Sequence, residues 1–232
     1  MKLMINDLDG VVAEFISSFN FNSNGRHASF DYCYNYFQQT IDLTEDVEKS
    51  CLVLGFYLAS WGMYRGSSFI LRKSIKHYEP TIQYISTLDK SVWKIDVNNY
   101  DSEKIKIILD IYKEIQSRLI PGNNADLTLI TKVLLGVFGF VPAFDNYFCN
   151  AFRNITKGAG IGCRFRSLNK KSLEVIKEFY LANKNAIANI SKQTFTTNFS
   201  GGKTEINYPK AKIIDMYGFA VSYNEFIKNK NK

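Results

Sequence analysis

Lys132 and Asp145 would be the amine and the carboxylate of an active site if the protein is an enzyme, which the sequence leaves open. They lie before and within LLGVFGFVPAFDNYF, where two glycines, a proline and one aspartate interrupt an apolar run. Gly139 and Pro142 favour a turn, after which Asp145 begins the next helix. A carboxylate at a helix start can activate water. The alternative is that Asp145 only caps this helix.

The segment KGAGIGCRFR, Lys157 to Arg166, has the composition of a phosphate-binding loop. Its three alternate glycines allow backbone N–H groups to approach a phosphate, and Arg164 and Arg166 add positive charge. It lacks the GK[ST] ending of a P-loop, and no strand precedes it as a Rossmann fingerprint requires. A flexible loop with exposed arginines is the alternative interpretation.

The segment WGMYRGSSFILRK interleaves Arg65, Arg72 and Lys73 with aromatic residues. Surfaces that stack nucleotides have this composition. An aromatic stripe at helical spacing also forms buried cores, and Trp61 continues the apolar stripe of the preceding helix. We therefore expect Trp61 inside and Arg65 at the surface.

His27 and Asp31 are four residues apart, in GRHASFDYCYNYF. On a helix this spacing places both side chains on one face, where they can form an acid–base or hydrogen-bonded pair. A structural pair near the start of that helix is the interpretation that we favour.

The N-terminal residues Asp7-Leu8-Asp9-Gly10 resemble the first motif of haloacid-dehalogenase-type phosphatases. In such enzymes a strand-end aspartate attacks phosphate, which requires a buried strand before the motif and Mg²⁺-binding carboxylates after later strands. Here Asn6 stands where a strand residue is expected, and alternating β–α units are missing. We expect a helix with acids at its start, and the sequence predicts no metal site and no cofactor.

Positive charge is segregated along the chain. Residues 49–78 and 146–173 hold 11 of the 29 basic residues and none of the 22 acids, although the net charge is only +7. Such segregation indicates a positive surface for a polyanion, provided that the two segments meet in space. The residues expected to contact phosphates are Arg65, Arg72, Lys73, Arg153, Lys157, Arg164 and Arg166.

The elements that must position these residues are mainly helices. Helical spacing of apolar residues predicts helices over about 7–19, 29–40, 45–71 (loosened by glycines at 62 and 66), 77–88, 101–119, 126–135, 143 onward, 169–190 and 211–227. Thr44 is the expected N-cap of the third. Residues 194–208 alternate β-forming residues around Gly201-Gly202 and predict one small β-hairpin. The fold class is therefore all-α, with one mostly helical domain over residues 1–232.

Composition excludes several classes of protein. The sequence is 46% hydrophobic and 15% aromatic, which does not fit a disordered chain, and no apolar run reaches the length of a membrane span. The four cysteines form no CxxC pair, so we expect free, mostly buried thiols. The N-terminus does not read as a signal peptide, and we expect a cytoplasmic protein.

Residues 126–155 resemble the helix-hairpin-helix DNA glycosylases. Those enzymes carry a hairpin of the type L-P-G-V-G followed by an aspartate that begins the next helix; here Leu135-Gly136-Val137-Phe138-Gly139 precede Asp145. The resemblance implies hairpin amides that contact DNA phosphate and a carboxylate that stabilises an oxocarbenium ion. The Pro-Gly pair is missing and Lys132 precedes the hairpin. The stretches WGMYRGSS, VPAFDNYF and YPKAKIIDMYGFA are also similar to uncharacterised bacterial helical proteins, which implies no chemistry.

We expect a nucleic-acid-binding protein, with DNA favoured, that contacts phosphates through its two acid-free segments. Such contacts would set affinity without sequence specificity. The alternative is a helical interaction module, for instance a component of a toxin–antitoxin or phage-defence pair, whose basic face docks an acidic partner protein. A third and weaker possibility is a phosphate enzyme that uses Asp7 and Asp9.

Overall fold

The computed structural model describes residues 3–18, 23–122 and 124–230, in which helices predominate. The α-helices are α1 (Leu8–Ser18), α2 (Ala28–Gln39), α3 (Val47–Ser60), α4 (Glu79–Ser86), α5 (Ser102–Leu119), α6 (Leu127–Phe138), α7 (Asn146–Gly158), α8 (Lys170–Ala182), α9 (Lys184–Gln193) and α10 (Lys210–Lys230). Short 3₁₀-helices are η1 (Phe69–Arg72), η2 (Ile75–Tyr78), η3 (Val92–Lys94) and η4 (Val97–Asn99). Strands β1 (Phe195–Thr197) and β2 (Lys203–Asn207) form an antiparallel hairpin. The all-α prediction with one small hairpin is confirmed.

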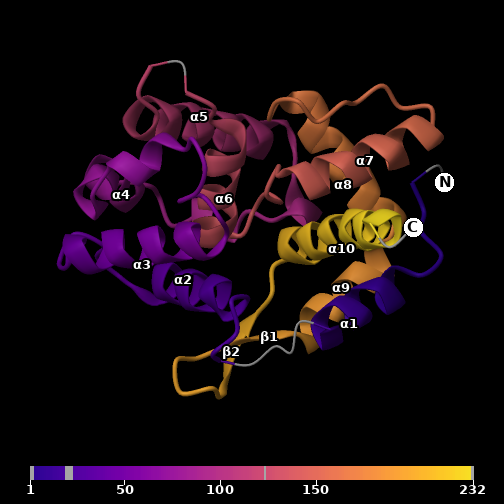
Figure 1. Cartoon of the computed structure of the whole chain (residues 1–232), viewed down its shortest axis with the longest axis horizontal. Helices are drawn as coiled ribbons and strands as arrows, with labels where there is room; N and C mark the ends of the chain where they lie inside the picture. Colours follow the sequence, from indigo (N-terminus) through magenta and orange to yellow (C-terminus); the bar gives the residue numbers. More distant parts are fainter. Residues whose placement is uncertain (1–2, 19–22, 123, 231–232) are drawn as a thin grey trace.

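The helices form two groups that meet along the middle of the molecule (Figure 1). Helices α2 to α6 lie on one side, and α1 and α7 to α10 lie on the other. In the second group α10 packs against α7, α1 and α9, while in the first α2 packs against α3 and α6. One continuous hydrophobic core joins the two groups. Among the described helices, none is both long enough and apolar enough to cross a membrane.

Helix α6 is the centre of this core. Every residue from Leu129 to Phe138 is buried, which is the pattern of a helix surrounded by other elements on all sides. Its C-cap, Gly139, has a φ of 72°, a left-handed conformation that glycine adopts without steric cost. The four cysteines are free and buried, as the sequence predicts.

The joint between α6 and α7 is internal. Residues 139–144 are buried, and side chains of α10 and α6 accept hydrogen bonds from two of their backbone N–H groups. Asp215 Oδ1 accepts from the Ala143 N–H at 3.0 Å, and Thr131 Oγ1 accepts from the Phe144 N–H at 2.9 Å. The expectation of a hairpin whose amides contact DNA phosphate is therefore wrong for this segment, because its backbone lies in the core.

The predicted helix over 169–190 is interrupted at Asn183, which separates α8 from α9. The buried Asn183 side chain accepts from the Ile5 N–H and donates to the carbonyl of Leu3, both at 2.8 Å. Tertiary hydrogen bonds with the N-terminal segment thus accompany this break, and the local pattern carries no sign of them.

Two helix starts can be compared with their predictions. Asp46, not Thr44, caps α3, and its side chain accepts from the Lys49 N–H. Asp7 precedes α1, and its Oδ1 accepts from the Gly10 N–H at 3.1 Å, so the phosphatase-like motif begins a helix. The predicted end of this helix, Phe19, lies outside the described residues.

We predict that Gly136→Ala lowers the free energy of unfolding by about 1–3 kcal/mol, as overpacking of a core does. A Cβ atom at Gly136, inside α6, would overlap the ring of Tyr57 on α3. Gly158→Ala is the matched control, because a Cβ atom there meets nothing within 4 Å. Because Gly158 is the last residue of α7, this control should change the free energy of unfolding by less than about 1 kcal/mol. Urea unfolding measures both, and equal effects would contradict the close approach of α3 and α6.

Candidate functional site

Lys132 is a charged residue within the buried helix α6. Its side chain is only 6% exposed, so its ammonium group must be solvated by the protein. The Nζ atom donates to the carbonyl of Trp61 at 2.9 Å and lies 4.0 Å from Asp145 Oδ2. Trp61 is the C-cap of α3, where the helix dipole favours a cation. The structure therefore brings together the two residues that the sequence nominates for catalysis.

Asp145 uses its two carboxylate oxygens differently. Its Oδ1 accepts from the Phe148 N–H at 3.0 Å and so caps α7, as the sequence predicts. Its Oδ2 is the oxygen that faces Lys132. Burial raises the pKa of Asp145, an effect that the positive charge of Lys132 opposes. Burial also lowers the pKa of Lys132, an effect that Asp145 opposes.

A second buried ion pair lies beside the first. Lys212 Nζ is 2.9 Å from Asp215 Oδ2, and both residues are on α10. A small enclosed space of about 10 Å³ is lined by Lys132, Asp145 and this pair, and it offers room for about one water molecule. Sequence reasoning missed Lys212 and Asp215. The available signal was two opposite charges three residues apart within the apolar run AKIIDMYGFA.

Trp61 lies among three cations. Its ring centroid is 5.2 Å from Arg26 Cζ, 5.4 Å from Lys132 Nζ and 5.0 Å from Lys212 Nζ. Cations at this range are attracted by the face of an aromatic ring. The His27 ring meets Trp61 edge-on at 5.2 Å. Trp61 is half-buried, so the expectation that it lies wholly inside is only partly met.

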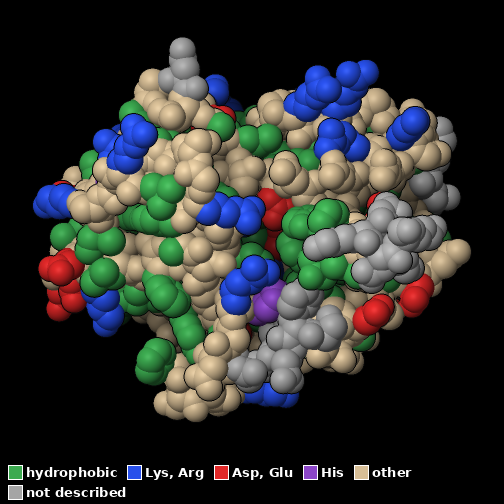
Figure 2. All heavy atoms as spheres, viewed as in Figure 1, with side chains coloured by type: hydrophobic (Ala, Val, Ile, Leu, Met, Phe, Trp, Pro, Cys, Tyr) green, Lys and Arg blue, Asp and Glu red, His purple; other side chains and the backbone are tan. Residues whose placement is uncertain are grey.

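An open cavity of about 470 Å³, here called the Lys–Asp cavity, lies over the first ion pair. Its aromatic lining is Trp61, Tyr147, Phe219 and Tyr223, and its polar lining includes Arg26, Arg65, Lys132, Asp145, Asn146 and Asn150. Figure 2 shows acidic atoms at the bottom of a hollow near the middle of the face, with basic side chains beside them. A planar ring that carries negative charge fits this combination of aromatic rings and cations.

The electrostatic balance of this cavity favours an anion. Arg26, Arg65 and Lys132 line it together with one acid, Asp145. The guanidinium group of Arg65 lies close to Gly62, whose φ of 76° places it at the left-handed turn after Trp61. Sequence reasoning predicted Arg65 but missed Arg26, which lies outside the two acid-free segments.

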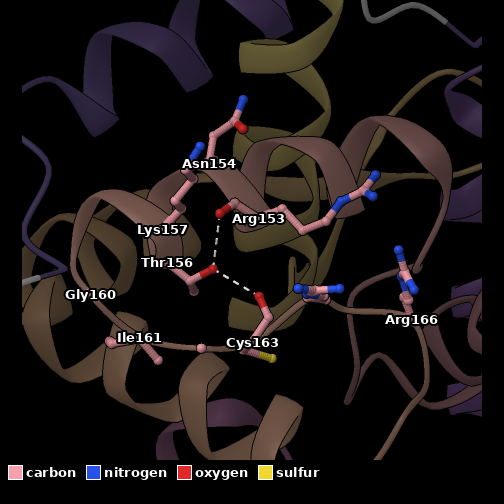
Figure 3. Close-up of a pocket in the computed structure, with 10 residues that line it drawn as sticks. Arg153, Asn154, Thr156, Lys157, Gly160, Ile161, Cys163 and Arg166 are labelled. Carbon is pink, nitrogen blue, oxygen red and sulfur yellow. Dashed lines mark hydrogen bonds between the residues drawn. The ribbon is translucent and has the colours of Figure 1, made fainter.

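The segment KGAGIGCRFR forms a second cavity of about 550 Å³, here called the loop cavity. Arg153, Lys157, Arg164 and Arg166 line it. The Thr156 hydroxyl lies 3.1 Å from the carbonyl of Arg153 and 3.0 Å from that of Cys163, which ties the loop to α7 (Figure 3).

The loop is anchored by Phe165. This residue has a φ of 49°, and its buried ring packs against Phe144, Phe148 and Phe152. Its neighbours Arg164 and Arg166 are exposed. The loop is thus fastened to the core between its two arginines, whereas the alternative prediction was a flexible loop.

The predicted phosphate-binding residues fall into three places. Arg65 lines the Lys–Asp cavity, four residues line the loop cavity, and Arg72 and Lys73, at and after η1, line neither. Within the described part of the chain, none of these seven residues forms an ion pair with Asp or Glu. Of the basic residues in segment 49–78, only Arg65 lines either cavity.

Asp31 fixes the β-hairpin to α2. Its carboxylate accepts from the Tyr208 hydroxyl at 2.6 Å and from the Thr197 N–H at 2.8 Å. Burial raises the pKa of Asp31 to about 6. These contacts support the structural interpretation of Asp31. Nearby, burial together with the charges of Lys212 and Arg26 lowers the pKa of His27 to about 3.

Comparisons with known proteins find no relative of this chain. No family model, no curated protein and no solved structure matches the chain.

We predict that His27 makes the protein less stable in mild acid. Its pKa is about 3 in the folded chain and about 6.5 for a free histidine, as in the unfolded chain, so the unfolded chain binds more protons between these values. This contribution to stability is present above pH 6.5 and is lost as the pH falls toward 3. From pH 7 to pH 5 the loss is about 2 kcal/mol by proton linkage.

The measurement is urea unfolding of the wild type and His27→Gln at pH 7 and pH 5. The His27→Gln variant should not show the loss of stability between pH 7 and pH 5. Asp31 contributes with the opposite sign, because a raised carboxyl pKa stabilises the fold at low pH and loses this effect as the pH rises through about 6. Asp31 is present in both proteins, so the difference between them isolates His27. Equal pH dependence in the two proteins would show that His27 is not buried as a neutral ring.

Proposed function

We propose that the protein binds nucleic acid, with phosphates on the basic residues of α7 and of the loop that follows it. The observation that carries this proposal is the loop cavity, which is lined by Arg153, Lys157, Arg164 and Arg166 and by no acid among the described lining residues. Four such charges repel one another unless an anion lies between them. The backbone of a nucleic acid supplies several phosphate anions in a row.

The Lys–Asp cavity favours nucleic acid over an acidic protein as the partner. It begins at the other end of α7 and combines cations with the rings of Trp61 and Tyr147. A nucleotide has both a phosphate for the cations and a planar base for the rings. An acidic protein surface would explain the cations but gives no reason for an aromatic cavity beside them.

We predict that Arg164→Ala/Arg166→Ala weakens nucleic-acid binding at least tenfold at about 0.1 M salt. Loss of two phosphate contacts should also reduce the slope of log K against log salt by about 1.4 on a single strand. Fluorescence anisotropy of a labelled oligonucleotide, titrated at several salt concentrations, measures both. The matched control is Lys106→Ala/Lys113→Ala, which removes the same charge from exposed positions on α5 and should change affinity less than twofold.

Two results would contradict the proposal. One is the absence of binding at low salt. The other is an equal loss of affinity in the α5 control, since that would indicate only a response to net charge. Purification of the protein with an acidic protein and without nucleic acid would instead support the helical interaction module.

For chemistry on the bound strand, we propose Lys132 as the amine and Asp145 as the carboxylate, as in the glycosylase-like hypothesis. Burial lowers the pKa of Lys132, which increases the neutral, nucleophilic fraction of its amine. Asp145 Oδ2 lies 4.0 Å away at the base of the cavity, where it can stabilise positive charge on a sugar. The two groups therefore face the same space with complementary roles.

We predict that Lys132 forms a reducible adduct with an oligonucleotide that contains an abasic site. The lysine nitrogen bonds to the aldehyde carbon of the opened sugar, water leaves, and borohydride delivers hydride to the resulting imine. Gel electrophoresis should show a covalent complex in the wild type and in Lys106→Met, and at least a tenfold loss in Lys132→Met. Circular dichroism checks that the variant is folded. An undiminished adduct in folded Lys132→Met would exclude this amine.

A further inference from the structure

We propose that the ligand is a single strand of nucleic acid that lies along the exposed face of α7, from the loop cavity to the Lys–Asp cavity. This inference rests on the proposed function and adds the form of the ligand and its path. Three independent features of the surface carry it: the polar face of α7, the shared lining of its cavities, and the aromatic rings of α10.

One face of α7 is polar and free of acids after its cap. Asn146, Asn150, Asn154 and Lys157 follow at helical spacing and are exposed, while Phe148, Cys149, Ala151, Phe152 and Thr156 are buried on the opposite face. From residue 146 to residue 157 the helix rises about 16 Å, at 1.5 Å per residue. At about 3.4 Å per stacked nucleotide, and more when the strand is extended, this length accommodates about three to five nucleotides.

A third cavity, of about 500 Å³, shares lining residues with each of the other two. It shares Tyr147 and Asn150 with the Lys–Asp cavity, and Arg153 and Asn154 with the loop cavity. The three cavities therefore follow one another along α7, and together they are called the α7 trough. Ser222 of α10 lines its middle part; this residue is 6% exposed, and its hydroxyl has no hydrogen-bond partner among the described residues. A bound ligand would satisfy that hydroxyl.

The aromatic rings beside the trough favour unpaired bases. Tyr147 lies 4.7 Å from Phe219, 5.9 Å from Tyr223 and 6.5 Å from Phe226, measured between ring centroids. Phe226 lines the middle of the trough and is 51% exposed. In a duplex the faces of the bases are covered by their neighbours, whereas the bases of a single strand can stack on aromatic side chains. A single strand therefore uses both the rings and the cations.

One acidic residue of the trough should weaken the binding of this ligand. Glu225, on α10, is exposed and lines the middle part of the trough, opposite Asn150 and Asn154. A strand that passes through this part brings its phosphates near that carboxylate. Removal of the charge should therefore tighten binding, an effect that a misfolded variant cannot imitate.

The test is anisotropy with fluorescein-labelled oligothymidylates of two to eight nucleotides. Affinity should rise steeply up to three to five nucleotides and then only slowly. Glu225→Gln should bind two- to fivefold more tightly, and Asn154→Asp, which adds an acid to the trough, five- to tenfold more weakly. Asn185→Asp, the same change at an exposed position on α9, should alter affinity less than twofold. A duplex of mixed sequence should bind at least tenfold more weakly than either of its separated strands.

Two results would overturn the path while leaving the proposed function intact. One is binding that depends on Arg164 and Arg166 but not on Asn154 or Glu225, which would place the ligand outside the trough. The other is a duplex that binds as tightly as the single strand. Absence of any nucleic-acid binding would overturn both the path and the proposed function.

Discussion

Lys132 carries an ammonium group on a helix that is buried on every side, so polar groups of the protein must solvate this charge. The arrangement of the site follows from that requirement. The partners of the ammonium group are the Trp61 carbonyl at the end of α3, the Asp145 carboxylate at the start of α7 and the Trp61 ring. These contacts fix the end of one helix and the beginning of another against α6. Removal of one partner from a buried ion pair typically costs about 3–5 kcal/mol. The three helices are therefore coupled through one charge.

The same constraint orients the proposed binding surface. Because Asp145 begins α7 at the Lys–Asp cavity, the polar face of that helix runs away from the cavity toward the basic loop. Asp215 accepts a hydrogen bond from the Ala143 N–H, which links α10 to the segment that precedes α7. Gly218 allows α10 to pass close to the Phe148 ring, since a Cβ atom there would lie 2.7 Å from it. The trough is thus built on two helices with little freedom to separate.

The sequence predicts those parts of the site that depend on local rules. The cap formed by Asp145 is recognisable because an aspartate after Gly139 and Pro142 satisfies the first amides of the next helix. The charge segregation is equally visible, since it is a property of the chain. The proximity of Arg26, Trp61, Lys132 and Lys212 is not, because tertiary packing alone brings such distant residues together. The sequence also predicts that a core helix ends near Gly136 and Gly139, because apolar residues surround both glycines. The structure places Gly139 at the C-cap of α6 and Gly136 inside that buried helix.

The distribution of charge along α7 also decides which part of a nucleotide lies at which end. The loop cavity has four cations and no acid among its described lining residues, so it suits phosphates. The Lys–Asp cavity has two exposed cations, Arg26 and Arg65, and a buried pair at its bottom, Lys132 and Asp145. A phosphate at the bottom of the cavity would be repelled by Asp145 Oδ2. A nucleobase could instead donate a hydrogen bond to this carboxylate, and a sugar could develop a positive charge that the carboxylate stabilises. A strand that places most of its phosphates on the loop and a base or sugar over Asp145 therefore keeps its phosphates away from the only acid among the described lining residues of these two cavities.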